Sequence, residues 1–552
     1  MHRTQAKPRP RSNGALSAGS QPEQVFAFTS SSIANVVSMV RTVRLGIDFG
    51  TTRTVVAAVE DGNHPVVSFE DAAGDLHDHV PTVVALGPGH SFVSGWTAQE
   101  AVLHGAPSFR TLKRLLADPA TTGRERITLG TAEATLSQLL WMFAADLRTA
   151  LVEHSSLDLD GEERLEIALG VPAHAPSAQR FLTIDAFTRA GFEVLGLVNE
   201  PTAAAFEFLH RYPKQINSQR QSVIVYDLGG GTFDASMVQL GDAVHEVDRT
   251  LGLPNLGGED FDALLAELAL EHVPDEAKPH SDHEVGMLQE AARIAKERLT
   301  PQSRRLVLEV GDSVITIPVD EFSARAEKLV LMTLDTIERL LGGLDQDALA
   351  QAEVAGLYLV GGASSLPLVP RMMRERFARR VHRSPQAMAA TAIGLALYAD
   401  PDAQHVMRER LGRGIGVFRE REGGAKFGFD VLIEPGSRVD TAGELRARRE
   451  YRAAHNIGSY RFLEFTELAG DDTPAGELVQ LAHVLVPFTA ALSHLGADDL
   501  ANAPIQRLNA GPLVEEELFV DANGIAHITM RVPALEVKIS RRIDLAVAQP
   551  ND

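Results

Sequence analysis

Residues 224–234 read Ile-Val-Tyr-Asp-Leu-Gly-Gly-Gly-Thr-Phe-Asp, and residues 45–52 read Leu-Gly-Ile-Asp-Phe-Gly-Thr-Thr. In each stretch an apolar run leads to an aspartate and then to a turn of glycine and threonine. An apolar run bounded by glycine predicts a buried strand that enters a tight turn. Two such units, far apart in one chain, predict two facing halves that present backbone N–H groups and hydroxyls to phosphate and a carboxylate to a metal ion.

The composition is that of a globular protein with more than one domain. The chain has 552 residues, of which 44% are hydrophobic and 23% charged, and this length exceeds what one core usually holds. The formal net charge of −22 argues against nucleic acid and against anionic membrane surfaces as partners. The chain has no cysteine, which excludes disulfides and thiolate chemistry and favours a reducing, cytoplasmic location.

The composition also divides the chain into three parts. Residues 1–42 are predicted to be a disordered extension, because Met1–Gln24 is polar and rich in proline, glycine and serine; the alternative is an overlong start with Met39 as the initiator. Residues 43–410 alternate predicted strands and helices, as α/β domains do. Residues 411–552 contain short apolar runs and a hairpin signal at Asn523-Gly524, which predict a separate β domain.

The two glycine–threonine turns supply the candidate phosphate ligands. Glycine has no Cβ, so the backbone N–H groups of such a turn come close to a phosphate group. The candidate ligands are Gly50, Thr51, Thr52, Gly229, Gly230, Gly231 and Thr232. Asp48 and Asp227 lie beside these turns, and we expect them to hold Mg²⁺ through water because Mg²⁺ keeps much of its hydration shell.

Two further segments complete the predicted site. Glu200 lies between a predicted strand and a predicted helix, where a carboxylate can orient or deprotonate an attacking water molecule. Asp234 is expected to assist it. Gly257, Gly258 and Glu259 open a predicted helix, and helix N-termini bind anions. Several such motifs in one order predict a nucleotide phosphate site more strongly than any one of them.

These motifs together resemble the seventy-kilodalton heat-shock chaperones of the DnaK type. The resemblance is strong over about residues 44–400 and weaker over Glu515–Arg531, which looks like the peptide-binding sandwich of that family. The segments that carry it are Gly46–Thr52, Val171–Ala173, Asn199–Ala205, Asp227–Asp234, Leu256–Asp262 and Leu359–Gly362.

The resemblance implies an α/β actin-like (ribonuclease-H-like) ATPase domain of two lobes, followed by a smaller all-β sandwich. It implies slow hydrolysis of ATP to ADP with Mg²⁺, and clients that are unfolded or extended apolar peptides. It also implies J-domain-type or nucleotide-exchange co-chaperones. By motif, the resemblance assigns the hydrolysis and metal cluster to Glu200, Asp227, Thr232 and Asp234. It assigns the ribose and adenine contacts to Lys296 and Thr300, on one helical face. It assigns the loop under the adenosine to Gly361 and Gly362.

The chain also departs from the family pattern. The family places a lysine shortly after a Val-x-Gly turn, where this chain has Gln99 or Glu100, and we assign Lys113 and Arg114 to a different stretch that does not replace it. Such a lysine would stabilise charge on the γ-phosphate. Near the predicted adenine contacts, the chain has Arg293, Glu297 and Ser365 where the family has other residues. The interdomain linker is charged at 408–413, and the chain ends at Asp552, which leaves no room for a helical lid.

Three functions follow from these observations. The first is a chaperone-like ATPase that binds peptide segments. The second is a nucleotide-binding interaction protein with little or no hydrolysis, which the missing lysine at Gln99 would favour. The third is a small-molecule kinase of the same superfold, against which the predicted β domain and the Asn199–Ala205 motif count. Turnover with ATP alone separates the three, because a kinase needs an acceptor.

Overall fold

The computed structural model describes residues 40–110, 112–118, 120–240, 245–273, 278–310, 313–342, 354–403, 410–421, 426–438, 444–470 and 473–542. Residues 1–39 of the predicted extension, including Met39, lie outside these ranges, and so do residues 408 and 409 of the predicted junction at 408–413. The prediction of disorder for the extension therefore stays a prediction, as does the boundary at residues 410 and 411.

The first sheet has the strand order β12-β11-β1-β2-β5. β1 (Thr42–Phe49) and β2 (Arg53–Ala58) form an antiparallel hairpin across the first predicted turn, and β5 (Val80–Pro81) pairs with β2. β11 (Arg164–Val171) and β12 (Glu193–Asn199) add parallel strands on the other side of β1. The interior of this sheet is built from continuous aliphatic runs, as expected for parallel strands covered on both faces.

The second sheet repeats this topology in the order β15-β14-β13-β18-β19. β13 (Ser222–Leu228) and β14 (Phe233–Leu240) form the hairpin across the second predicted turn, and β15 (His245–Leu253) extends it. β18 (Val354–Val360) and β19 (Val381–Arg383) are the parallel strands. The two equivalent halves predicted from the repeated Asp-Gly-Thr motif are thus two sheets with the same order of antiparallel and parallel neighbours.

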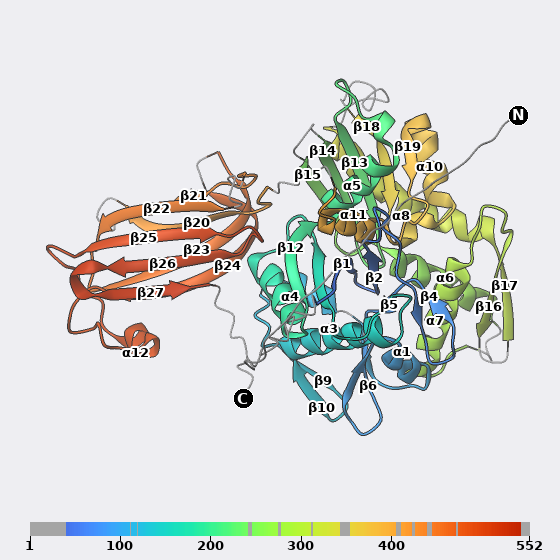
Figure 1. The fold of residues 1–552 in the computed structure, drawn as a ribbon, viewed down its shortest axis with the longest axis horizontal. Coiled ribbons are helices and arrows are strands. Elements are labelled where there is room, and N and C mark those ends of the chain that lie inside the picture. The colour runs from blue at the N-terminus through green and yellow to red at the C-terminus, as the bar shows by residue number, and fades with distance from the viewer. Residues whose placement is uncertain are drawn as a thin grey trace, which may run out of the picture. The chain divides into compact units, whose positions relative to one another are not determined.

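Two helices pack against each other between the sheets (Figure 1). α5 (Glu200–Arg211) contributes Ala204, Ala205 and Phe208 to a core shared with β13 and β18. α11 (Ala390–Ala399) packs on β1, β2 and β11. Because α11 follows the second sheet in the chain but covers the first, it ties the two sheets together.

The remaining helices cover the outer faces of the sheets. α3 (Leu136–Glu153) and α4 (Ser177–Arg189) share a core with the first sheet. The helices that share a core with the second sheet are α6 (Gly258–His272), α7 (Asp282–Glu297), α8 (Val319–Leu340) and α10 (Leu368–Phe377). The shorter elements are β3 (Phe69–Glu70), β4 (Leu76–His77), β6 (Val84–Leu86), β7 (Phe92–Ser94), α1 (Gly95–Leu103), β8 (Ser108–Phe109), α2 (Leu112–Ala117), β9 (Arg126–Leu129), β10 (Ala132–Thr135), β16 (Arg305–Val310) and β17 (Ser313–Pro318).

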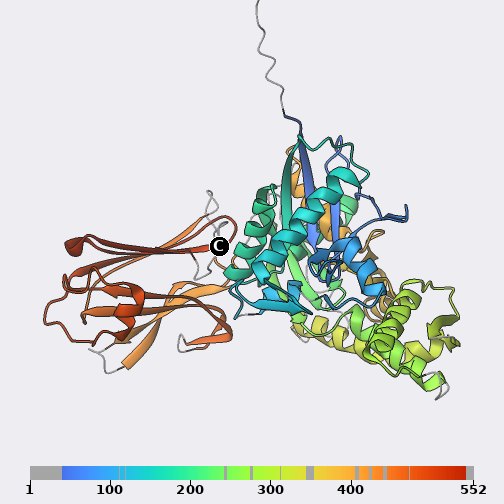
Figure 2. The same ribbon diagram turned by 90° about the horizontal axis from the view of Figure 1, so that it is seen from below.

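The C-terminal strands form two four-stranded sheets, in the orders β21-β20-β23-β24 and β22-β25-β26-β27. These sheets lie face to face as two layers (Figure 2) around one apolar core that includes Val417, Phe462, Leu518 and Ile528. The elements are β20 (Gly414–Arg421), β21 (Lys426–Ile433), β22 (Leu445–Arg452), β23 (Ile457–Leu468), β24 (Pro474–Pro487), α12 (Ala497–Asn502), β25 (Leu513–Val520), β26 (Ala526–Val532) and β27 (Val537–Arg541). The predicted hairpin at Asn523-Gly524 joins β25 to β26.

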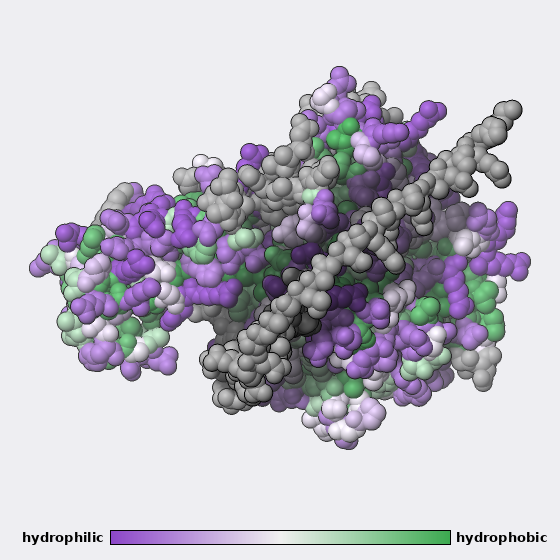
Figure 3. Space-filling view, viewed as in Figure 1, coloured by the Kyte–Doolittle hydropathy of each residue, from purple (hydrophilic) through white to green (hydrophobic). Residues whose placement is uncertain are grey.

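The face of the molecule in Figure 3 is mainly hydrophilic, with smaller hydrophobic areas between the charged side chains. This distribution agrees with the strongly acidic composition. None of the helices in the described ranges has the length and apolar character needed to cross a membrane.

The crossing of α5 and α11 depends on Gly394. A Cβ atom at this position would overlap the carbonyl group of Ala203 in α5. We therefore expect Gly394→Ala to lower the free energy of unfolding by about 1–3 kcal/mol, as overpacking does, measured as a lower midpoint of thermal unfolding.

Gly286 is the matched control for this substitution. It lies in α7, and a Cβ atom added there would meet no other atom within 4 Å, so Gly286→Ala is expected to raise stability by about 0.5–1 kcal/mol. Equal midpoints for the two variants would contradict the close approach of α5 and α11.

Candidate functional site

The two predicted phosphate turns face each other. Gly50, Thr51 and Thr52 connect β1 to β2, and residues 229–232 connect β13 to β14. A Cβ atom on Gly230 would lie 2.6 Å from the Thr52 hydroxyl oxygen. The turns of the two sheets are therefore in contact, and only glycine fits at this point.

Four carboxylates lie at the ends of elements beside these turns. Asp48 and Asp227 are the next-to-last residues of β1 and β13, Asp234 is paired with Asp227 across the β13–β14 hairpin, and Glu200 is the first residue of α5. Burial, together with the charge of Glu200, raises the pKa of Asp48 and of Asp234 to about 7. The same causes raise the pKa of Asp227 well above its ordinary value. These carboxylates therefore act on one another, as the sequence predicted for one site.

A lysine lies inside this cluster, but it is not at the predicted position. Lys113 in α2 donates a hydrogen bond of 2.6 Å to the Glu200 carboxylate, and its side chain is only 12% exposed. Burial opposes the charged form of Lys113, but Glu200 and Asp48 outweigh it and raise the pKa of the amine. The structure therefore places Lys113, and not Gln99 or Glu100, beside Glu200, which counts against the sequence prediction that Lys113 does not replace the missing lysine.

Gln99 and Glu100, where the lysine was expected, lie elsewhere. They belong to α1 and line a separate cavity of about 840 Å³ together with Trp96 and Asp146. A local signal does accompany Lys113: it lies between leucines of which Leu112 and Leu116 pack in the core, and an ammonium group drawn toward a core needs a carboxylate partner.

The next residue, Arg114, connects the second phosphate turn to α6. Its guanidinium donates to the carbonyl of Gly231 at 3.3 Å and to the carboxylate of Glu259 at 2.7 Å. It thus joins α2, which packs in the core of the first sheet, to two elements of the second sheet.

The N-terminus of α6 braces the second turn in this structure. The backbone N–H groups of Gly258 and Glu259 donate to the carbonyls of Gly229 and Gly230 at 2.9 and 2.8 Å. The N–H of Gly257 donates to the Asp260 carboxylate at 2.7 Å. Because these three N–H groups are already bonded, the helix N-terminus supports the turn here instead of offering free donors to an anion.

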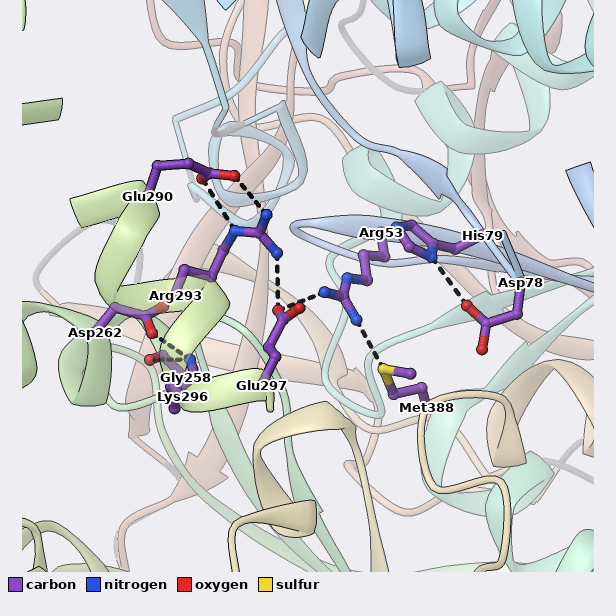
Figure 4. Close-up of polar contacts among 10 residues, drawn as sticks. All are labelled: Arg53, Asp78, His79, Gly258, Asp262, Glu290, Arg293, Lys296, Glu297 and Met388. Carbon is purple, nitrogen blue, oxygen red and sulfur yellow. Dashed lines mark hydrogen bonds and ion pairs between the residues drawn. The ribbon is translucent and has the colours of Figure 1, made fainter. Parts of the chain in front are cut away.

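The predicted ribose and adenine contacts separate in the structure. The Lys296 amine lies 2.6 Å from the Asp262 carboxylate and 2.8 Å from the Gly258 carbonyl (Figure 4). Thr300 does not share its helical face, because α7 ends at Glu297; its hydroxyl lies 3.1 Å from that of Ser303. The assumption of one helical face for Lys296 and Thr300 is therefore wrong.

Gly361 and Gly362 follow β18 and adjoin both parts of the site. Gly361 has φ 82°, and a Cβ there would overlap the Asp227 carboxylate. A Cβ on Gly362 would lie 3.4 Å from Cγ of Met388. This glycine pair therefore lies between the carboxylate cluster and Met388.

The chemistry of the cluster suits Mg²⁺. Asp48 and Asp227 offer carboxylate oxygens, which Mg²⁺ prefers as ligands. Lys113 offsets only one of the four carboxylate charges, so a divalent cation would favour their ionised forms. Within the residues described, His, Asp and Glu side chains do not form any group of three or more arranged to hold a metal ion directly.

The fold and site define an α/β protein with two matching sheets and a buried carboxylate–lysine cluster where their hairpins meet. The family model described as Hsp70 protein matches residues 144–404. The chain is 29% identical to the chaperone protein DnaK of Thermus thermophilus over 534 residues, covering 88% of this chain and 78% of the relative. It is 31% identical to the chaperone protein HscA of Edwardsiella ictaluri over 405 residues, covering 68% and 62%. The chain therefore belongs to the Hsp70 family of DnaK-type chaperones.

Lys113 provides a direct test of the site. Lys113→Met keeps the length of the side chain and removes its charge, so we expect single-turnover hydrolysis of Mg·ATP to fall by about 100-fold, as with the loss of one preorganised charge donor. Gln99→Lys is the control and should leave the rate unchanged, because α1 faces a different cavity. If Lys113→Met unfolded at the wild-type temperature and hydrolysed ATP at the wild-type rate, Lys113 would have no role in hydrolysis.

Proposed function

We propose that this chain is a cytoplasmic, ATP-dependent chaperone of the DnaK type that hydrolyses ATP slowly and binds extended apolar peptide segments. The observation that carries the proposal is the contact between the two phosphate turns beside a buried lysine and four carboxylates. Membership of the Hsp70 family supports ATP hydrolysis, and the names of its relatives support a chaperone function. Unfolded clients, J-domain-type partners and nucleotide-exchange partners are part of the proposal.

Each group at the phosphate end has a proposed role. The backbone N–H groups of Thr51, Thr52, Gly230, Gly231 and Thr232 and the threonine hydroxyls bind the phosphates. The N–H groups of Gly50 and Gly229 close the two turns by bonding the carbonyls of Arg53 and Thr232. Lys113 stabilises the negative charge of the transferred phosphoryl group, and Glu200, held by Lys113, orients the attacking water molecule and accepts its proton. When bound, Mg²⁺ would neutralise phosphate charge, with Asp48 and Asp227 holding it through water.

The remaining predicted residues have supporting roles in the proposal. Asp234 and Thr232 complete the hydrolysis cluster. Lys296, Thr300, Gly361 and Gly362 form the nucleoside side, and Gly257, Gly258 and Glu259 support the second turn. An actin-like arrangement of two lobes fits the repeated sheet topology.

The alternatives lose support at this point. An interaction protein without hydrolysis was favoured by the missing lysine at Gln99, but Lys113 supplies an amine to the carboxylate cluster. A kinase would transfer phosphate only to an acceptor, so turnover with ATP alone would argue against it.

Mg·ATP binding tests the proposal as a whole. We expect millimolar Mg·ATP to raise the thermal midpoint by mass action. The absence of both a thermal shift and a calorimetric signal would rule out the nucleotide site.

Glu200→Gln separates hydrolysis from binding. The variant should keep its ATP affinity and lose about 100-fold or more in single-turnover rate, because the amide cannot accept the proton. Glu162→Gln, an exposed loop substitution, is the matched control. Equal rates in wild type and Glu200→Gln would exclude Glu200 as the base.

A candidate peptide surface lies on the β20–β21 strands. β21 is an edge strand of its sheet, and edge strands are the kind that pair with an extended peptide. Arg421 and Arg449 donate to its Phe429 and Val431 carbonyls, so a peptide would pair with the remaining backbone groups. Phe418 and Phe427 lie on the same face of these strands and are 43% and 74% exposed. Phe418 packs on buried Phe429 at 5.1 Å between ring centroids, so the exposed rings extend an ordered aromatic cluster.

The exposed aromatic side chains predict where an apolar peptide binds. Phe427→Ser should weaken the affinity for a labelled extended apolar peptide by about tenfold, because a large apolar contact is lost. Ile505→Ser removes an equally exposed apolar side chain, 69% accessible and outside the strands, and should have no effect. Equal losses in both variants would show that peptide binding is not specific to the β20–β21 surface.

A further inference from the structure

Arg53 is the first residue of β2 and directly follows the phosphate turn at Thr51 and Thr52. Its side chain nevertheless leaves that turn and reaches Glu297, in a helix packed with the second sheet, and Met388, in the turn before α11 (Figure 4). Its guanidinium forms an ion pair with Glu297 at the end of α7 and contacts the Met388 sulfur at 2.8 Å. Arg53 thus extends from the first sheet to partners that are far away in the sequence.

These partners surround the nucleoside side of the site. Met388 lies beside the Gly361–Gly362 loop, since a Cβ on Gly362 would be 3.4 Å from its Cγ. Glu297 directly follows Lys296, whose amine bonds the Gly258 carbonyl at 2.8 Å. Arg53 therefore lies where a nucleoside would extend from phosphates bound at the two turns.

The position of the Arg53 guanidinium is fixed by a row of charges. Glu297 also accepts a hydrogen bond of 2.9 Å from Arg293, which pairs in turn with Glu290. Burial opposes ionisation of Glu297, but Arg53 and Arg293 outweigh it and lower the pKa of the carboxyl group. The Arg53 side chain is only 20% exposed, so it is held in place and largely shielded from water.

Two further titratable side chains, His79 and Asp78, lie within electrostatic range of Arg53. His79 and Asp78 lie close to it in Figure 4, where the His79 ring is 3.0 Å from the Asp78 carboxylate. Burial lowers the pKa of His79, and the charge of Arg53 contributes to this shift. The hydrogen bond from His79 and the charge of Arg53 lower the pKa of Asp78, so this carboxylate is a second anion near Arg53. Glu297 is the carboxylate that bonds the Arg53 guanidinium directly.

We propose that Arg53 is a base-contacting residue that forms one wall of the nucleoside subsite and stacks its guanidinium plane on a purine ring. This inference rests on the proposed nucleotide function. A guanidinium is planar, always charged and weakly hydrated, and it packs on the π face of an aromatic ring. Glu297 and Arg293 act as positioning residues that hold this plane. The larger purine ring offers more stacking surface than a pyrimidine, so the wall selects for purine nucleotides.

The test separates base contact from phosphate contact by using two probes, Mg·ATP and magnesium tripolyphosphate. Calorimetry on Arg53→Ala should show ATP affinity about tenfold weaker and tripolyphosphate affinity unchanged. The ratio of the ATP affinity to the UTP affinity should fall by a similar factor. Arg53→Lys should behave like Arg53→Ala, because it keeps the charge but loses the plane.

Arg325→Ala is the matched control, since Arg325 forms an exposed 2.6 Å pair with Glu271 away from the site. It should leave both affinities unchanged. Equal losses for ATP and tripolyphosphate in Arg53→Ala would make Arg53 a phosphate ligand. Tighter ATP binding would make it a blocking residue, and unchanged ATP binding would remove it from the subsite; each of these results overturns the inference. Wild-type protein that binds neither probe would instead refute the nucleotide function itself.

Discussion

The structure depends most on the burial of several carboxylates around one lysine. Carboxylates removed from water favour their neutral forms, and the raised pKa values of Asp48, Asp227 and Asp234 express this effect. The ion pair between Lys113 and Glu200 at 2.6 Å offsets part of the charge. Such a cluster is stable only when the positions of its charged groups are fixed. Each acid lies at the end of a strand or at the start of a helix, where the backbone fixes its position.

The fold provides this geometry by bringing two similar hairpins together. The hairpins come from separate sheets, and they approach so closely that Gly230 touches Thr52. The crossing of α5 and α11 holds the sheets in this relation, and Gly394 permits the crossing. The small residues of the protein thus lie where backbone must approach backbone, and the large aliphatic residues fill the cores on either side.

The proposed phosphate end and the proposed nucleoside end of the site differ in how charge is arranged. At the phosphate end, one lysine faces several acids, which leaves a negative cluster suited to a divalent cation. At the nucleoside end, Arg53, Glu297, Arg293 and Glu290 alternate in sign and offset one another. The carboxylate cluster around Lys113 needs further positive charge to be balanced. The row of Arg53, Glu297, Arg293 and Glu290 has equal numbers of positive and negative groups, and it holds the planar Arg53 guanidinium in position.

The sequence by itself determined the two strand–Asp–turn units, the alternating α/β pattern and the C-terminal strands, because each depends on apolar periodicity and turn residues within a short segment. It also identified Glu200 at the start of a helix. Only the tertiary structure decided that Lys113 enters the carboxylate cluster and Gln99 does not, because this depends on where α2 packs. The reach of Arg53 to Glu297 was likewise decided by packing, since contacts between distant segments leave no periodic signal in the sequence. The end of α7 before Thr300, in contrast, has a local cause that the sequence contains, because Pro301 follows Thr300.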